Sequence, residues 1–437
     1  MCDSMVASAD MARDGYTIFA KASDRACNEA QYFVYVPAAD HAPGQKVRCT
    51  LIEIEQATHT NAVMLSKPSW VWGCEIGVNE YGVCTGNESV FSKEMNTTTD
   101  GLFGMDICRI ALERAKTAQE AVEVMAEMME RYGQGGNASF DSVFYYDNGY
   151  LITDPNESWH FETAGNLWAA KKISGSYSIS NYLSIATPDL MHRDLVQTAI
   201  DRGYPVSEPF DFAESYMNWN HPVNVSGMVR RSCSYRLMQK SKKCTVGDMV
   251  AALRSHTTDK PWTGGGKSVC MHASHPTSSD DVSTQTTNCM IAVCKPGDTT
   301  MWGPGMSISC IAPFQPFWFD AYSSKLVFAY DKQEEAMDSW LKREQLNRAM
   351  LDGKLPEAAY KAELHNMQNR WFEQVEAVSR GDRQALCDQI ADEAEMFVDK
   401  WLKITAGTVS KPMGSAEFQK YWSGMNAALG KNRTIAY

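Results

Sequence analysis

CDSMVASADMARDGYTIFAKASDR, residues 2–25, is the stretch that decides the expected fold. Two short segments in it, Met5–Ser8 and Tyr16–Lys21, have the composition of β-strands. Between them lies Asp14-Gly15, a strong signal for a hairpin turn. The pattern predicts an antiparallel pair whose first strand begins at Cys2.

Further strands and helices alternate in blocks along the chain. Val47–Glu55 is expected to be a strand because it alternates and is rich in branched residues, and Ser142–Tyr146 is expected to be another. Residues 107–133 predict two consecutive helices, the second capped by Thr117. Hairpin-linked strands followed by helical pairs favour an α+β fold of antiparallel sheets covered by helices. The chain from Lys332 to Lys403 is helical and rich in charge.

Composition excludes several classes of protein. The 437 residues carry a formal net charge of −12, and no basic cluster suited to nucleic acid or an anionic membrane occurs. No apolar run approaches the roughly 20 residues that span a bilayer. The 13 cysteines include no CxxC pair, and residues 1–5 carry no signal-peptide pattern, so we expect a cytoplasmic protein with reduced thiols. Assembly into a homo-oligomer stays open.

Known cofactor and hydrolase motifs are missing from the sequence. It has no HExxH, no EF-hand loop and no GxSxG elbow. His272-Ala273-Ser274-His275 offers two imidazoles but no evident third ligand, so it is a weak zinc motif. We therefore expect neither a metal nor a cofactor.

Cys2 is the candidate nucleophile. Removal of Met1 would place a thiol and a free α-amine on one residue. The reference pKa of such an amine is about 8, so part of it is neutral and basic near pH 7. It can take the thiol proton and later donate it to the leaving group. The hairpin brings Lys21, Asp24 and Arg25 close to Cys2, where a cation lowers the thiol pKa and a carboxylate holds the ammonium. A solvated turn with an ion pair is the simpler alternative for these three residues.

These motifs resemble the dipeptidase A and secernin family. That family opens with Cys-Asp-Ser/Thr and continues with Lys-Asn-Ser-Asp-Arg, for which this chain has Cys2-Asp3-Ser4 and Lys21-Ala22-Ser23-Asp24-Arg25. Later segments keep the family order; they are Ile76–Val83, Gly86–Phe91, Glu162–Ala170, Ile179–Ile185, Ser268–Ala273 and Trp302–Gly305.

The resemblance implies an N-terminal-nucleophile (Ntn) hydrolase with an αββα sandwich, related to penicillin V acylase and bile salt hydrolase. Residues 2–330 would form the catalytic domain, and 331–437 a mostly helical segment packed on it. Cys2 would be the nucleophile, Asp24 the residue that binds its amine, and Lys21 the cation beside the thiol. The resemblance further assigns an oxyanion-binding role to two asparagines, Asn87 and Asn181.

Two features of the chain depart from the family pattern. Ala22 replaces the usual asparagine. A later arginine of the related acylases has three candidates here, Arg230, Arg231 and Arg236.

Three functions remain open. The first is a cysteine dipeptidase that cleaves dipeptides through a thioester, and the second is an amidase acting on a non-peptide amide. The third is a non-hydrolytic, secernin-like regulator that uses its charged helical tail. A dipeptidase must bind an ammonium and a carboxylate, so residues of both charges should line its pocket.

Overall fold

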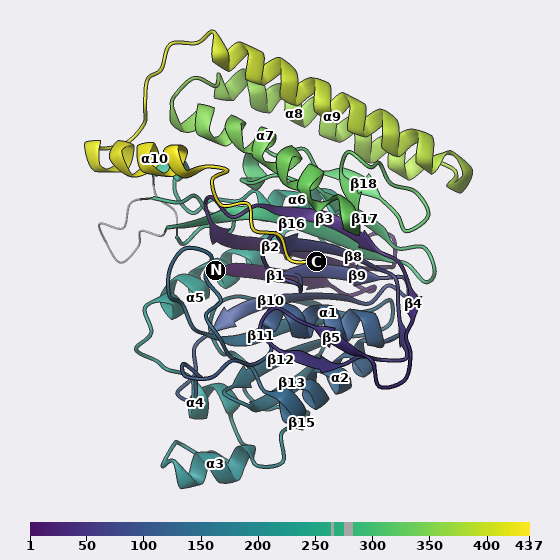
Figure 1. The fold of residues 1–437 in the computed structure, drawn as a ribbon, viewed down its shortest axis with the longest axis vertical. Coiled ribbons are helices and arrows are strands. Elements are labelled where there is room, and N and C mark those ends of the chain that lie inside the picture. The colour runs from purple at the N-terminus through teal and green to yellow at the C-terminus, as the bar shows by residue number, and fades with distance from the viewer. Residues whose placement is uncertain (264–265, 275–282) are drawn as a thin grey trace.

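The computed structural model describes residues 1–263, 266–274 and 283–437. Two large β-sheets lie face to face, and helices cover their outer faces (Figure 1). The predicted αββα order of layers is confirmed.

The first sheet carries the N-terminus. In the described residues its strand order is β14 (Ser176–Ile179), β1 (Cys2–Ala7), β2 (Thr17–Ala26), β16 (Thr284–Cys294), β17 (Thr300–Gly303) and β18 (Gln315–Phe317). All of these neighbours are antiparallel. The predicted hairpin of β1 and β2 forms, with Ser4 opposite Lys21 and Cys2 opposite Ser23.

The second sheet is longer, and only its last pair, β3 with β19, is parallel among the described strands. Its order is β15 (Leu190–Met191), β13 (Leu167–Ile173), β12 (Ser158–Ala164), β11 (Asp147–Thr153), β10 (Cys84–Val90), β9 (Ile76–Asn79), β8 (Val63–Pro68), β3 (Gln31–Val36) and β19 (Val327–Ala329). Two small ribbons lie outside both sheets: β4 (Ala39–Asp40) with β7 (His59–Thr60), and β5 (Lys46–Arg48) with β6 (Glu53–Glu55).

Helices from three parts of the chain form the outer layers. The second sheet is covered by α1 (Gly104–Arg114) and α2 (Ala118–Tyr132). The first is covered by α5 (Val223–Met238), α6 (Val246–Leu253), α8 (Glu357–Ala377) and α9 (Arg383–Ala406) (Figure 1). Helix α7 (Gln333–Leu351) packs on both sheets, since its first half lies against β3 and β19 and its second half belongs to the core under α8 and α9. The shorter helices are α3 (Leu195–Asp201), α4 (Phe212–Tyr216), α10 (Ala416–Ala428), η1 (Pro261–Thr263), η2 (Ser309–Ile311), η3 (Tyr330–Lys332) and η4 (Arg380–Asp382).

Strand periodicity assigns each side chain of the β1–β2 hairpin to one layer. Val6 and Phe19 lie in the apolar core between the sheets. Met5 and Ala20 point the other way, into the core under the C-terminal helices. Because alternate residues share a face, Cys2, Ser4 and Lys21 lie on the inner face, whereas Asp3 and Asp24 lie on the outer face.

Strand β16 contains a bulge opposite the end of β2. Thr286 pairs with Asp24 and Asn288 pairs with Ser23, so Thr287 is an extra residue. Below the bulge Cys289 belongs to the outer core and Met290 to the inner core.

Most local predictions hold, and two strands are wrong. Thr117 caps α2 by accepting a hydrogen bond from Glu120 N, and Gly133 ends this helix with φ 64°. Val47–Glu55 forms the two short strands of a hairpin instead of one strand. Ser142–Tyr146 is no strand, because the Asn137 side chain binds Ser142 O and Phe144 N and folds the segment into a loop.

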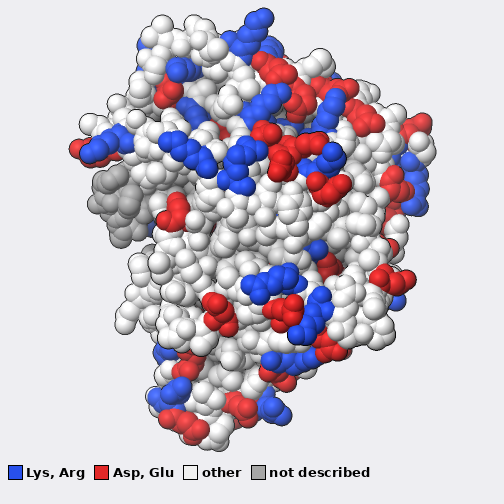
Figure 2. Space-filling model, viewed as in Figure 1, with Lys and Arg blue, Asp and Glu red and all other residues white. Residues whose placement is uncertain are grey.

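The surface bears charges of both signs. On the face in Figure 2, basic and acidic side chains alternate over the C-terminal helices, without a wide region of one sign. No described helix combines the length and the apolar character needed to cross a bilayer.

Gly86 on β10 leaves the space that Lys21 fills between the sheets. A Cβ at this position would lie 2.2 Å from Lys21 Cδ. We expect Gly86→Ala to lower the free energy of unfolding by about 1–3 kcal/mol, the usual cost of overpacking. Urea denaturation measures the loss. Gly424→Ala is the control, since no atom lies within 4 Å of its Cβ and α10 favours alanine. Equal stability of Gly86→Ala and the wild type would contradict this packing.

Candidate functional site

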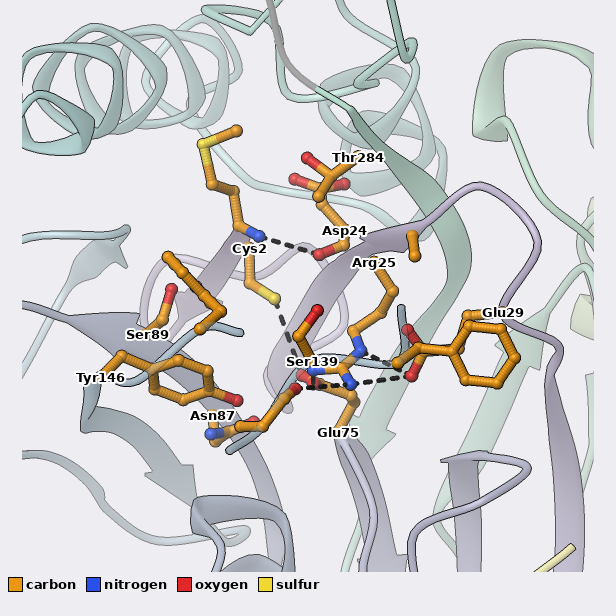
Figure 3. A pocket seen from close by; sticks show the side chains of 15 residues that line it. Cys2, Asp24, Arg25, Glu29, Glu75, Asn87, Ser89, Ser139, Tyr146 and Thr284 are labelled. Carbon is orange, nitrogen blue, oxygen red and sulfur yellow. Dashed lines mark hydrogen bonds and ion pairs between the residues drawn. The ribbon is translucent and has the colours of Figure 1, made fainter. Parts of the chain in front are cut away.

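Cys2 is the first residue of strand β1, and its side chain lies on the inner face of the first sheet, next to a small cavity (Figure 3). The cavity has a volume of about 60 Å³. Backbone pairing with β2 fixes the position of the cysteine, which is buried. The other side chains on the wall are mostly polar or aromatic: Asp24, Arg25, Glu29, Glu75, Asn87, Ser89, Ser139, Phe140, Phe144, Tyr146 and Thr284, together with Met1 and two alanines.

The thiol of Cys2 is protonated while Met1 is attached. Its Sγ donates to Glu75 Oε2 at 3.6 Å. Burial raises the pKa of the thiol to about 11, and the Glu75 carboxylate adds to this effect while Lys21 opposes it. At neutral pH the thiol therefore needs a base before it can attack a carbonyl.

Lys21 supplies the positive charge beside this thiol. The side chain is fully buried between the sheets, with Nζ 3.4 Å from Glu75 Oε2 and 3.8 Å from Glu88 Oε1. Burial alone would lower the pKa of Lys21, but Cys2 and the two carboxylates raise it above its ordinary value. The amine stays charged, in the position expected for a cation near the nucleophile.

Asp24 lies against the first residue of the chain. The Met1 ammonium donates to Asp24 O at 2.8 Å, and Asp24 N donates to Met1 O at 2.8 Å. Of the carboxylate oxygens, Oδ1 accepts from Thr286 Oγ1, and Oδ2 has no hydrogen-bond partner among the described residues. Burial raises the pKa of Asp24 to about 7, although the chain terminus and Arg230 lower it. Asp24 Oδ2 is thus an available hydrogen-bond acceptor beside Cys2.

Asn181 holds the nitrogen of Cys2. The Cys2 N–H donates to Asn181 Oδ1 at 2.8 Å, and the Asn181 amide group donates to Ser89 O and Ser89 Oγ. The resemblance predicts an oxyanion donor here, and that role stays a prediction. In this structure Asn181 Oδ1 accepts a hydrogen bond from the Cys2 nitrogen.

Arg230 is the arginine that reaches the site. It is fully buried and donates to Cys2 O at 3.0 Å, to Asp3 Oδ2 at 2.6 Å and to Asn181 Oδ1 at 2.6 Å. The two alternatives lie elsewhere: Arg231 binds Ser178 O and Tyr182, and Arg236 is exposed and binds Ser232 O.

Asn87 lies on the cavity wall, on strand β10. Its amide donates to Asn148 Oδ1 at 2.7 Å, and its backbone N–H donates to Glu75 O. Its Oδ1 has no partner in the described part of the chain. The role in binding an oxyanion stays a prediction, as do the roles of the other four residues.

The sequence reasoning placed Arg25 near Cys2 but missed its two ion-pair partners on the same wall. Arg25 donates to Glu29 at 2.7 Å and to Glu75 at 3.1 Å, and all three are buried. Glu75 precedes β9 without any motif of its own. A signal was present, however, since a lone acidic residue next to an apolar strand needs a buried partner.

The family model described as peptidase family C69 matches residues 1–201. The predicted resemblance to the dipeptidase A family is therefore confirmed for this part of the chain.

Individual relatives are distant. A dipeptidase of Bifidobacterium longum is 26% identical over 216 residues, which make up 43% of this chain and 38% of the relative. The match thus spans less than half the length of that curated protein. Among solved structures, a variant of the conjugated bile acid hydrolase of Clostridium perfringens is 11% identical with a TM-score of 0.44, covering 73% of this chain and 93% of that one. A Caenorhabditis elegans ortholog of N-acylethanolamine-hydrolyzing acid amidase has a TM-score of 0.33 at 10% identity, covering 68% and 93%.

The raised thiol pKa predicts how Cys2 is alkylated. Only the thiolate reacts, so the rate for chains that retain Met1 should rise about tenfold per pH unit from pH 7.5 to 9.5 without levelling. Mass spectrometry of the N-terminal peptide reads the rate and separates chains with and without Met1. In the unfolded protein the same peptide should level off near its ordinary pKa, about 8.5. A plateau below pH 9 in the folded, Met1-containing chain would contradict the buried thiol.

Arg230 should stabilise the fold because it neutralises Asp3. Arg230→Gln leaves a buried carboxylate without its counter-charge, which we expect to cost about 3–5 kcal/mol in urea denaturation. Asp3→Asn combined with Arg230→Gln should lose less than the sum of the single variants. Arg236→Gln, on the same helix but exposed, is the control and should change stability by less than about 0.5 kcal/mol. Equal losses for Arg230→Gln and Arg236→Gln would refute the pairing.

Proposed function

We propose that this protein is a cysteine-dependent dipeptidase that uses Cys2 as an N-terminal nucleophile. The observation that carries the proposal is the cavity beside Cys2, which brings a thiol, a held nitrogen and side chains of both charges together. The match of residues 1–201 to peptidase family C69 supports the same reaction class.

The reaction begins once Met1 has been removed. The α-amine of Cys2, held by Asn181 Oδ1 and next to the free acceptor Asp24 Oδ2, takes the thiol proton. Sγ then attacks the carbonyl carbon, and the amine passes the proton to the leaving nitrogen as the peptide bond breaks. Water attacks the resulting thioester, loses a proton to the same amine and restores the thiol. Lys21 stabilises the thiolate between these steps.

The charges of the wall favour a dipeptide over a neutral amide. Asp24, Glu29 and Glu75 outnumber the basic Arg25 there, and such an excess of carboxylates suits a substrate ammonium. Arg25 suits the carboxylate at the other end of a dipeptide, in exchange for one of its present partners. The small volume fits a short substrate, and loss of the Met1 side chain enlarges the cavity.

Hydrolysis by the purified chain tests the proposal. Mass spectrometry first establishes the fraction of molecules that begin at Cys2. Cys2→Ala should lower kcat/KM for dipeptides by more than about a thousandfold, the scale on which loss of a nucleophile acts. Cys49→Ala, at another buried cysteine, is the control and should keep activity within about threefold.

A substrate panel separates the alternatives. Dipeptides should be cleaved, and N-acetyl dipeptides and dipeptide amides should be poor substrates because each lacks one charge. Equal cleavage of simple acyl-amides would favour the amidase. If chains that begin at Cys2 hydrolyse neither class, both enzyme assignments fail and the regulator remains.

A further inference from the structure

A second cluster of reactive side chains lies on the outer side of the first sheet. It consists of His256 after α6, Cys270 and His272 in the segment before β16, and Cys310 in η2. One ligand atom from each lies within 4.8 Å of all the others. The two cysteines and His272 are buried, and His256 is partly buried.

Three distances in this cluster, all measured to His272 Nε2, match the edges of a tetrahedron around a metal ion. His256 Nε2 lies 3.2 Å from His272 Nε2, and His272 Nε2 lies 3.5 Å from Cys270 Sγ and 3.6 Å from Cys310 Sγ. Zinc bonds of about 2.05 Å to nitrogen and 2.3 Å to sulfur imply N–N edges of about 3.4 Å and N–S edges of about 3.6 Å. The side chains are thus spaced as ligands of one ion.

Hydrogen bonds alone do not satisfy these groups. An imidazole nitrogen carries either one proton or one lone pair, so it makes one hydrogen bond. Three groups nevertheless converge on His272 Nε2. A cation at the common centre accepts a lone pair from each of the four side chains at once.

We propose that His256, Cys270, His272 and Cys310 bind one Zn²⁺ ion as a structural site. Two thiols lose their protons to solvent, and two neutral imidazoles complete the shell. The charge of the ion then cancels that of the two thiolates, which allows burial of the complex. Four protein ligands leave no open position, as is typical of structural zinc. Tetrahedral S₂N₂ donors also select zinc over calcium or magnesium.

Hydrogen bonds hold the three ligand-bearing segments together. Cys270 N donates to Ser255 O at 3.1 Å, and Ser309 Oγ donates to Leu253 O at 2.6 Å. Hydrogen bonds between residues next to the ligands therefore already link the segments that carry them, so little rearrangement is needed to bind an ion.

The zinc site would brace the back of the Cys2 cavity. Met271, between two ligands, accepts from Thr286 N at 3.0 Å and donates its own N–H to Thr286 Oγ1 at 2.9 Å. That hydroxyl donates to Asp24 Oδ1. The weak motif seen in the sequence thus contributes His272 with other partners; His275 lies outside the described residues.

Metal analysis of the full chain tests this site. Elemental mass spectrometry should find about one zinc per chain after purification without chelator. Cys270→Ser and Cys310→Ser should each lower the zinc content at least tenfold. Cys289→Ser is the matched control, because this buried cysteine lies outside the cluster, and it should retain zinc. Cys2→Ala should also retain zinc, so failure of the proposed dipeptidase leaves this result unaffected.

Cobalt provides a second measurement that needs no variant. Exchange of the wild-type protein with Co²⁺ should give one cobalt per chain, with the visible bands of tetrahedral cobalt and the near-ultraviolet charge transfer of two thiolates. Zinc-free protein that takes up neither ion stoichiometrically would overturn the proposal. So would a wild-type chain that carries iron in place of zinc, or full zinc content in the Cys270→Ser, Cys310→Ser double variant.

Discussion

The site depends on the pairing of β1 with β2. Backbone hydrogen bonds between these strands place Cys2 opposite Ser23 and Ser4 opposite Lys21. Because strand side chains alternate, this single register sends the thiol and the lysine inward and sends Asp24 outward. The contacts of Asn181 and Arg230 with Cys2 are thus made to strand β1 after its pairing with β2 has fixed the position of Cys2.

What the sequence predicts well is what neighbouring residues decide. The hairpin, the Thr117 cap and the Gly133 helix end follow from short-range signals, and all three are present. Contacts between distant segments carry no such signal: Glu75 lies 73 positions from Cys2, and Arg230 lies 228 positions from it. Periodicity likewise cannot tell a strand from a loop when one side chain, such as Asn137, supplies the hydrogen bonds that the backbone needs.

The space between the two sheets near Cys2 holds charged side chains where apolar ones would pack more stably. Lys21, Glu75 and Glu88 are buried together, where the lysine offsets the charge of both carboxylates and Arg25 is a further partner of Glu75. Gly86 adds to this arrangement by giving up its own side-chain volume to the lysine. A fold selected for stability alone would fill this space with hydrocarbon. The charged side chains in this space are a further sign that the residues near Cys2 serve chemistry.

The bulge at Thr287 determines which side chains of strand β16 face outward. If the strand were regular, with Thr287 opposite Asp24, alternation would turn Thr286 to the same side as Met290, away from Asp24. The bulge places its hydroxyl on the side of Cys289 instead, where it reaches the carboxylate. Deletion of Thr287 would therefore straighten the strand and leave both of its ends in register, with Thr286 still opposite Asp24 and Asn288 still opposite Ser23. Deletion of a paired residue such as Gln285 would instead shift the end of the strand beyond it by one position and turn its side chains to the other face.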